Sequence, residues 1–364
     1  MSQKISALPV GAKVRDTKTK YYGVPIPFQI GDKNHAGYPS NSTTLVVEKI
    51  IKLCCFDATE SGGNSDRQNY GNNRMVLANI RQWLNKSGTG WYQAQHSYDR
   101  PPSNAYVWSN YNEYDGEAGF LTGFGPEMLA ALLTTTLTVA KPTVDGGGSE
   151  TFQDKVFLLS MAEVGLGSEN GISEGSKLAL FSDNNSRKAY PTAQAVSNSE
   201  YTNSSLSASQ PWYWWLRSPY SSLANYVRYV YSDGTLSYGY AYIGNNGVRP
   251  ALYLKSDISV SLDGNDESTI EVSEEELYKA AVQKFGERAQ ILVAIEEMSE
   301  LSQAILKLVF CEDYGIGDEQ AIRDNISMER ADVEIMLNQL HVIFGDNSEM
   351  ECKRLDNLES LLEG

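Results

Sequence analysis

The chain has 364 residues and a formal net charge of −16, and almost all of the excess negative charge lies near its C-terminus. Residues 271–364 carry 8 Lys and Arg against 22 Asp and Glu, a net charge of −14. Such an acidic surface repels phosphate backbones, which argues against nucleic acid as a partner. The chain begins without an apolar signal core, and no stretch approaches the length of a membrane span. We therefore expect no membrane span and a cytoplasmic protein, or a virion-associated one if a phage encodes it.

Composition divides the chain into two domains of different class. All six tryptophans and most of the glycines lie in the first part. The tail is built largely from Glu, Leu, Ile, Ala and Met, which favour helices. The polar, aperiodic stretch 261–272 predicts a linker between a first domain at 1–260 and a second at 273–364. The four cysteines show no metal-binding spacing, so we expect free thiols.

The first 260 residues contain short β-like runs and frequent turn signals, with two longer periodic segments. Residues 74–84 are amphipathic and predict a helix. Residues 126–133 predict another, with a proline at a favoured first-turn position. His35 and His96 have no partner of a suitable type nearby in the sequence, so we expect structural roles for both.

A small meander of strands is predicted at the end of this domain. Residues 226–231 predict one strand, a turn follows at 232–234, and alternating side chains at 236–242 predict a second strand. Residues 248–254 predict a third, apolar strand. We expect the two tryptophans at 214–215 to anchor the meander to the core.

Tyrosine is unusually frequent in residues 218–254, where it stands beside Ser, Gly, Asn and Thr. This mixture is typical of binding paratopes, because Tyr supplies contact area at low entropic cost and the small polar residues adapt. The same tract contains no Lys, Glu, Gln, Met or Trp, the residue types that codons ending in a pyrimidine cannot encode. Randomisation of such codons would leave this gap. A tyrosine-rich exposed sheet without any diversification is the alternative.

The framework Trp-Trp-Leu-Arg-Ser-Pro at 214–219 and Gly-Val-Arg-Pro-Ala-Leu at 247–252 resembles C-type-lectin-like domains of phage and bacterial proteins. Some of these are the variable proteins of diversity-generating retroelements, to which residues 32–40 and 109–114 are also similar. The resemblance covers about residues 1–256 and implies a fold that presents diversified side chains to an unknown protein or glycan ligand. The ligand-binding, variable set that it implies is Tyr220, Ser222, Tyr226, Tyr229, Tyr231, Thr235, Ser237, Tyr238, Tyr240 and Tyr242.

Four helices are predicted in the acidic tail. A capping box at Ser273 opens the first, which should end near Phe285. The second should cover about 288–310, where apolar residues recur at helical spacing. The third should cover about 327–344, and a second capping box at 348–351 opens the fourth. Short connections between helices suggest a four-helix bundle.

Two pairs of acidic residues on these helices are suited to bind a metal ion. Glu297 and Glu300 stand on the second predicted helix, and Glu329 and Asp332 stand on the third. Because residues three apart lie on the same face of a helix, four carboxylates converge if the two helices pack side by side. Mg²⁺ suits such a site, since it prefers hard oxygen ligands. An acidic helical domain without activity is the alternative.

The spacing Glu-x-x-Glu on one helix and Glu-x-x-Asp on a later one resembles the MazG-like nucleoside triphosphate pyrophosphohydrolases. The flanking residues 294–304 and 329–337 are similar as well, and the resemblance covers about residues 273–364. It implies Mg²⁺-dependent hydrolysis of a nucleoside triphosphate to a monophosphate and pyrophosphate, in a homo-oligomer formed through the helical domain. The catalytic set that it implies is Glu296, Glu297, Glu300, Glu329 and Asp332, of which the last four are ligands of Mg²⁺.

Contacts to the nucleotide are less fixed in this family, and Lys307 and Asn338 are suggested only by their positions on the same helices. The fold class expected for the chain is α+β, a C-type-lectin-like domain followed by an all-α MazG-like domain. One hypothesis is an enzyme whose first domain chooses where the second acts. The other is a non-enzymatic phage or bacterial receptor-binding protein whose helical domain only oligomerises.

Overall fold

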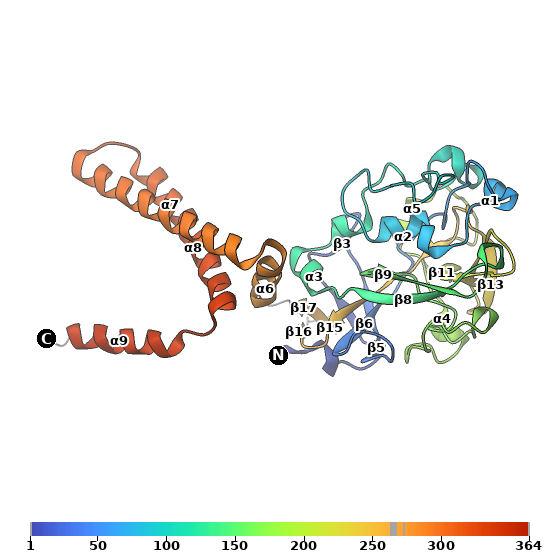
Figure 1. Ribbon diagram of the computed structural model, residues 1–364, viewed down its shortest axis with the longest axis horizontal. Coiled ribbons are helices and arrows are strands. Elements are labelled where there is room, and N and C mark those ends of the chain that lie inside the picture. Colours follow the sequence, from blue (N-terminus) through green and yellow to red (C-terminus); the bar gives the residue numbers. More distant parts are fainter. Residues whose placement is uncertain (1, 263–267, 272–273, 363–364) are drawn as a thin grey trace. The chain divides into compact units, whose positions relative to one another are not determined.

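The computed structural model describes residues 2–262, 268–271 and 274–362. It divides the chain into two compact units, Met1–Glu271 and Val272–Gly364, here called unit 1 and unit 2. Unit 1 combines β-sheets with short helices, and unit 2 is helical (Figure 1). The chain is therefore α+β, as predicted. Among the described residues, no helix has both the length and the hydrophobicity that crossing a membrane requires.

Two sheets form the framework of the described part of unit 1. Their strands are β1 (Ser2–Lys4), β2 (Lys13–Arg15), β5 (Phe28–Lys33), β6 (Ser42–Val47), β7 (Lys52–Leu53), β10 (Val156–Phe157), β11 (Trp214–Pro219), β12 (Tyr226–Val230), β13 (Leu236–Tyr240), β14 (Gly247–Val248), β15 (Ala251–Lys255), β16 (Ser259–Leu262) and β17 (Ser268–Glu271). The larger sheet has the order β1-β16-β17-β2-β5-β6-β15-β10, and the smaller has the order β13-β12-β11-β14-β7. Separate hairpins are formed by β3 (Lys20–Tyr21) with β4 (Val24–Pro25) and by β8 (Thr135–Ala140) with β9 (Ser149–Asp154).

Short helices connect these strands. They are α1 (Ser65–Tyr70), α2 (Asn79–Leu84), α3 (Pro126–Ala131), α4 (Asn184–Arg187) and α5 (Ala193–Ser197). The helix predicted at 74–84 forms only in its second half, because Ala78 is extended, with a φ of −66° and a ψ of 141°. The helix predicted at 126–133 begins at its proline, as expected, and ends two residues early.

The tyrosine-rich hairpin forms as predicted in its first two strands. β12 and β13 pair antiparallel, from Tyr226 opposite Tyr240 to Val230 opposite Leu236. The third strand differs from the prediction, because residues 248–254 are shared between the two sheets. β14 runs parallel to β11, whereas β15 pairs with β6. Pro250 separates them, and a proline has no N–H to continue a ladder of hydrogen bonds.

The two adjacent tryptophans of β11 anchor the hairpin, as predicted. Trp214 and Trp215 are fully buried on opposite faces of the strand. The indole N–H of Trp214 donates to the Arg187 carbonyl at 3.1 Å, and that of Trp215 donates to the Cys54 carbonyl at 3.0 Å. Each large apolar ring is thus buried with its polar atom paired.

Part of the segment expected to be a linker is instead a pair of strands. β16 and β17 pair antiparallel, and β17 also runs parallel to β2. Val260 and Ile270 are buried, which explains why these short strands join the sheet. Unit 1 therefore extends to Glu271 rather than to residue 260. Residues 263–267 and 272 of the expected linker lie outside the described residues.

Unit 2 consists of α6 (Glu274–Phe285), α7 (Glu287–Tyr314), α8 (Glu319–Phe344) and α9 (Ser348–Leu362) in its described part. The capping box predicted at Ser273 lies outside that part. α8 begins well before the predicted start, because the Asp318 side chain accepts the N–H groups of Gln320 and Ala321 at 3.0 and 3.2 Å.

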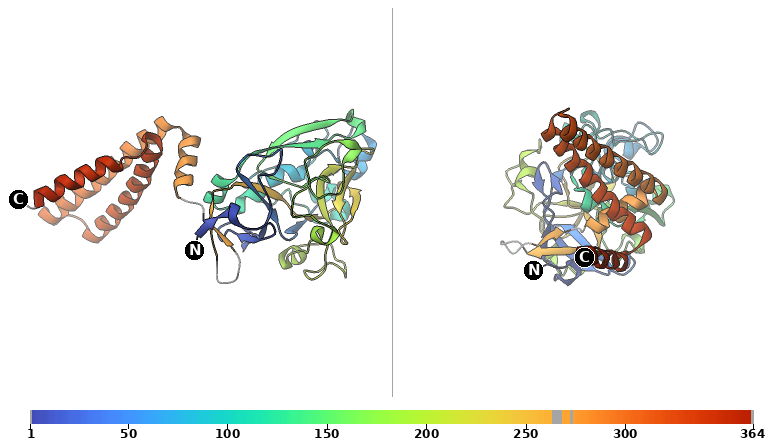
Figure 2. Two further views of the ribbon diagram at one scale, coloured as in Figure 1. Left: turned by 90° about the horizontal axis from the view of Figure 1, so that it is seen from below. Right: turned by 90° about the vertical axis from the view of Figure 1, so that its left-hand side faces the viewer.

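The four helices do not close into the expected bundle within one chain. α7 and α8 lie side by side, and α6 contacts both (Figures 1 and 2). In contrast, every α9 side chain that the structure describes is exposed. Its apolar residues Met350, Leu355, Leu358 and Leu361 therefore have no core to enter in a single chain.

Candidate functional site

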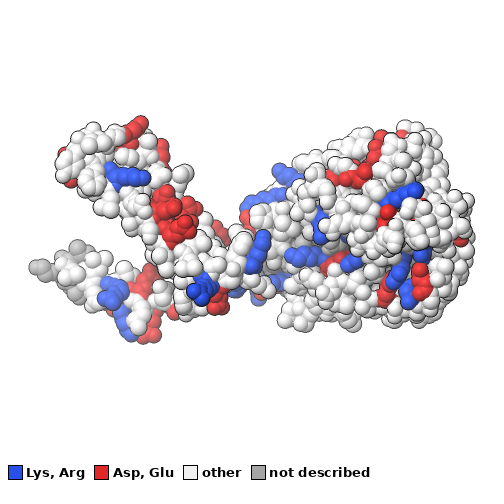
Figure 3. Space-filling model, turned by 45° about the horizontal axis from the view of Figure 1, so that its top comes forward, with Lys and Arg blue, Asp and Glu red and all other residues white. Residues whose placement is uncertain are grey.

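Packing of α7 against α8 brings three of the four predicted metal ligands together, and Asp332 is not among them. One carboxylate oxygen each from Glu297, Glu300 and Glu329 lies within 4.8 Å of the other two. No other three His, Cys, Asp or Glu side chains offer ligand atoms this close among the described residues. Figure 3 shows acidic side chains gathered on the helical unit. The expected convergence of these three carboxylates is therefore present.

Small and apolar side chains beneath the cluster explain the close approach of the two helices. Ala294 and Ala304 of α7 are 1% and 2% exposed, and Val333 and Met336 of α8 are also buried. Because residues three or four apart share a helix face, these buried positions leave the acidic side chains beside the seam between the helices. The glutamates thus stand at the edge of a packed interface, where they retain access to solvent.

Repulsion from the neighbouring carboxylates is visible in the pKa of Glu297. Partial burial raises the pKa of Glu297, and the charges of the other predicted acids raise it further. In decreasing order of effect, these acids are Asp332, Glu300, Glu329 and Glu296. The charges of the other four predicted acidic residues therefore all act on the Glu297 carboxylate.

The donor set fits Mg²⁺. It consists of carboxylate oxygens, without imidazole or thiolate, and such hard ligands suit Mg²⁺ better than the softer transition metals. The raised pKa of Glu297 reflects repulsion among the negative charges of the cluster. A divalent cation would relieve that repulsion, and would leave coordination positions for water and phosphate oxygens.

Asn325 orients one member of the cluster. Its side-chain N–H donates to Glu329 Oε1 at 3.3 Å, from one turn earlier on α8. A hydrogen bond of this kind reduces the rotational freedom of a metal-binding carboxylate. Asn325 was not predicted from the sequence, although its spacing of four residues from Glu329 places both on one helix face.

The two suggested nucleotide-contacting residues lie away from the carboxylates along their helices. Lys307 follows Glu300 by two helical turns, which is about 10 Å along the axis. Asn338 donates a hydrogen bond to the Glu334 carbonyl at 2.9 Å. It also lies beside Tyr278 of α6. The contact of Asn338 with its own helix and with α6 gives it a local structural role.

The tyrosines of the predicted variable set are divided between the two faces of the β12–β13 hairpin. On one face, the ring centroid of Tyr226 lies 4.4 Å from that of Tyr240 and 5.1 Å from that of Tyr238. On the other face, Tyr229 and Tyr231 contact Tyr213, at 5.7 and 6.2 Å. The predicted set is therefore not a single surface, because successive side chains of a strand point in opposite directions.

The first of these clusters extends beyond the predicted residues. Tyr70 of α1 stacks on Tyr240 with centroids 4.2 Å apart. The Arg228 guanidinium lies 4.4 Å from the ring centroid of Tyr220 and pairs with Glu169 at 2.8 Å. Our sequence reasoning missed these residues. For Arg228 the strand parity was a signal, since it shares a face with Tyr226.

Exposure differs across the remaining members of the predicted set. Tyr231 and Tyr238 are the exposed tyrosines of the set, at 44% and 47%, and Ser222 and Thr235 are also exposed. Thr235 donates its hydroxyl to Asp233 at 2.6 Å, within the turn. Those that are half-buried are Tyr220, Tyr226, Tyr229, Ser237, Tyr240 and Tyr242.

Both histidines that were expected to lack partners have them. His35 Nδ1 lies 2.7 Å from Asp32 Oδ2, and His96 Nε2 lies 3.3 Å from Glu60 Oε1. The expectation was wrong for His35 because Asp32 is only three residues away. For His96 it was wrong because Glu60 approaches from a distant segment.

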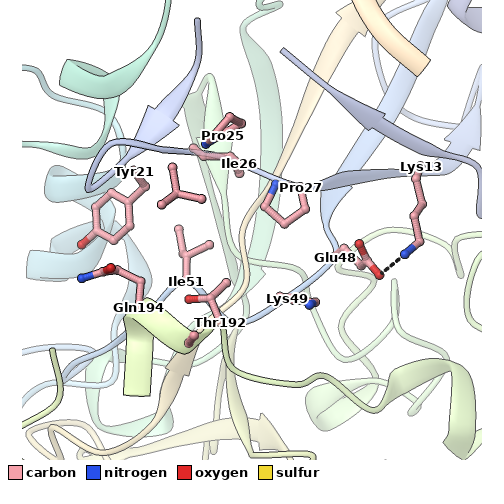
Figure 4. A pocket seen from close by; sticks show the side chains of 12 residues that line it. Lys13, Tyr21, Pro25, Ile26, Pro27, Glu48, Lys49, Ile51, Thr192 and Gln194 are labelled. Atoms are coloured by element: carbon pink, nitrogen blue, oxygen red, sulfur yellow. Dashed lines mark ion pairs between the residues drawn. The ribbon is translucent and has the colours of Figure 1, made fainter. Parts of the chain in front are cut away.

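A pocket in unit 1 coincides with neither predicted site. It has a volume of 300 Å³ and lies between the β3–β4 hairpin, the segment after β6 and the start of α5. Ile26, Pro27 and Ile51 line it, and the ion pair of Lys13 with Glu48 stands at one end (Figure 4). Its size is at the lower end of small-molecule pockets.

Residues 41–256 match the model of a domain of unknown function, DUF6273. The chain belongs to the DUF6273 family. The DUF6273 match begins at β6 and ends after β15, so it includes the tyrosine-rich hairpin and excludes the helical unit. Searches of curated proteins and of solved structures returned no match to the chain.

Proposed function

We propose that unit 2 is an Mg²⁺-dependent pyrophosphohydrolase that converts nucleoside triphosphates to monophosphates and pyrophosphate. The observation that carries the proposal is the approach of Glu297, Glu300 and Glu329 within 4.8 Å on α7 and α8. Asp332, the fourth expected ligand, is near enough for its charge to raise the pKa of Glu297. We propose that unit 1, which contains the DUF6273 match, is a C-type-lectin-like module whose binding determines where the enzyme acts.

The acidic side chains have different roles in such a site. Glu297, Glu300, Glu329 and Asp332 would hold the ion, and without it their charge repels a triphosphate. When bound, Mg²⁺ would neutralise phosphate charge and acidify a coordinated water. Glu296 stands beside the cluster as a carboxylate that accepts the proton of the attacking water. The scissile bond lies between the α and β phosphates, as the resemblance to MazG-like enzymes implies.

Exposed apolar side chains of unit 2 support assembly into a homo-oligomer. Large apolar residues that remain more than half exposed include Leu292, Ile295, Met328, Phe344 and Leu358. Exposed apolar side chains that gather into one patch usually mark an interface. A second copy of unit 2 would bury it and would give α9 a packing partner.

The direct test is release of pyrophosphate from a panel of nucleoside and deoxynucleoside triphosphates with Mg²⁺. Glu300→Gln should reduce the rate by 100-fold or more, on the order expected for loss of a metal-binding group. Glu334→Gln removes the same charge from an exposed position of α8 and should leave the rate unchanged. A folded chain that releases no pyrophosphate from any substrate would refute the activity.

A non-enzymatic receptor-binding protein is the second candidate, and the tyrosine clusters of the hairpin favour it. Binding to glycan arrays and to bacterial surface proteins should depend on Tyr238, which is 47% exposed. Tyr98, which is 46% exposed outside the hairpin, provides the matched control. Loss of binding in Tyr238→Ala but not in Tyr98→Ala supports the hairpin as the binding surface. Codons for 218–254 that do not end in pyrimidines would rule out its diversification.

A further inference from the structure

A serine, a histidine and an aspartate meet in unit 1, and none of the three belongs to either proposed site. Ser176 Oγ lies 3.1 Å from His35 Nε2, and His35 Nδ1 lies 2.7 Å from Asp32 Oδ2. His35 follows β5, and Ser176 lies in the long connection between β10 and β11. In a catalytic triad, a nucleophile contacts a general base, and the base contacts a carboxylate that orients it. Ser176, His35 and Asp32 make their contacts in the same order.

The imidazole is held in a defined orientation. Asp32 also accepts the backbone N–H of Lys33 at 2.8 Å and that of Ala179 at 3.1 Å, so its carboxylate is fixed on both oxygens. The ring of Tyr38 stacks on the imidazole with centroids 4.9 Å apart. Because Nδ1 donates to Asp32 in a neutral ring, Nε2 is left to accept the hydroxyl proton of Ser176.

A second contact of the ring favours the charged form that proton transfer creates. His35 Nε2 lies 3.0 Å from the carbonyl oxygen of Ser176. This oxygen accepts a hydrogen bond only when Nε2 carries a proton. Once the hydroxyl proton has moved to Nε2, the imidazolium donates to Asp32 on one side and to this carbonyl on the other.

The serine is accessible, and its surroundings provide unused hydrogen-bond donors. Ser176 is exposed, whereas the His35 side chain is 4% exposed. The backbone N–H groups of Ser176 and Lys177 donate to no acceptor in the described part of the chain, and an oxyanion formed beside Ser176 would need such donors. Gly175 has a φ of +109°, and a Cβ there would lie 2.5 Å from the Tyr38 hydroxyl, so glycine is needed at this turn.

We propose that Ser176 is the nucleophile of a second activity, hydrolysis of small activated esters of carboxylic acids. Ser176 Oγ bonds to the ester carbonyl carbon while its proton passes to His35 Nε2. The bond from that carbon to the alcohol oxygen then breaks, and Nε2 returns the proton to the departing alcohol. Water attacks the acyl-serine in the same way, which releases the carboxylic acid and restores the serine hydroxyl.

Covalent labelling of the full chain tests this proposal. A fluorophosphonate probe should modify the peptide that contains Ser176, and p-nitrophenyl acetate should give a burst of p-nitrophenol from the same protein. Ser176→Ala should abolish both. Ser173→Ala, which changes another exposed serine of the same loop, should leave both unchanged. Absence of labelling, or equal labelling of Ser176→Ala, would overturn the proposal.

The base and the positioning residue are tested separately. His35→Gln should lower the labelling rate by on the order of 100-fold, with folding of unit 1 verified by tryptophan fluorescence. Asp32→Asn should lower the rate and remove the low-field proton resonance of His35 Nδ1–H. If either variant fails to fold, the Ser176→Ala result alone decides. A folded His35→Gln chain that reacts at the normal rate would show that His35 is not the base.

Discussion

Replacing Glu297 with glutamine should stabilise the helical unit when no divalent cation is present. Two unit charges 4.8 Å apart, the upper limit in this cluster, repel by about 0.9 kcal/mol at the dielectric constant of water. Physiological salt reduces this to about 0.5 kcal/mol. Glu297 forms such pairs with Glu300 and Glu329. Its neutralisation should therefore raise the free energy of unfolding by about 1 kcal/mol, or about 4–8 °C in Tm for a unit of this size.

Magnesium should reverse the order of stability. A ligand that binds the folded state at a concentration of 100 times its Kd stabilises that state by about 2.7 kcal/mol. The wild-type chain should gain this stabilisation as Mg²⁺ is added, whereas Glu297→Gln should gain little. The variant is thus more stable than wild type without Mg²⁺ and less stable with it.

Two spectroscopic signals separate the units in this assay. All six tryptophans lie in unit 1, so their fluorescence follows its unfolding. The long helices lie in unit 2, so the far-ultraviolet circular dichroism mainly follows that unit. The matched control is Glu334→Gln, because Glu334 forms an exposed ion pair with Arg330 at 3.5 Å. Its loss should change the stability by less than about 1 kcal/mol, and towards destabilisation.

The effect should also depend on pH with a defined sign. Burial and neighbouring charge raise the pKa of Glu297 above its ordinary value of 4.5, so the folded state binds this proton more tightly. The resulting stabilisation is complete below the unfolded pKa and is lost as the pH rises through the folded pKa. The difference between wild type and Glu297→Gln should therefore shrink as the pH falls towards 4.5. The reasoning is refuted if Glu297→Gln destabilises the metal-free chain, or if Glu334→Gln stabilises it equally.

Three further outcomes are expected. Arg217 and Glu163 are fully buried and joined at 2.5 Å, so Arg217→Met should cost about 3–5 kcal/mol in urea unfolding, and adding Glu163→Gln should recover part of the loss. A thiol reagent should modify the exposed Cys352 and spare Cys54, whose pKa burial raises to about 12; rapid reaction at Cys54 would contradict its burial. Leu358→Glu on α9 should shift the assembly towards monomer in sedimentation velocity, and an unchanged mass would remove α9 from the interface.

Local signals were sufficient for most of the helical unit. Gly286 and Gly345 have positive φ angles and separate helices, as their positions predicted. The carboxylate cluster was also predictable, because a spacing of three residues places two side chains on one helix face. The packing of α7 against α8 was a condition of that prediction, and the structure supplies it through a connection of only four residues, 315–318, which favours antiparallel neighbours.

Prediction was weaker where the partner of a segment is distant in the sequence. The apolar run 248–254 was correctly seen as extended, but its division between two sheets depends on β6, β7 and β11. Tyr226, Tyr229, Tyr238 and Tyr240 were correctly located on strands, whereas Tyr231 and Tyr242 lie just beyond the strand ends. Their separation into two clusters depends on Tyr213 and Tyr70, which approach from outside the hairpin.

The sequence by itself determined the acidic helical tail, the pairing of its carboxylates by helical spacing and the alternation of the tyrosine-rich strands. These features depend on residues within one or two turns or strands, where backbone geometry alone decides which side chains are neighbours. Only the tertiary structure decided that β17 belongs to the first unit and that His35 meets Ser176, 141 residues away. Such contacts depend on how the sheets pack, and no local periodicity encodes that packing.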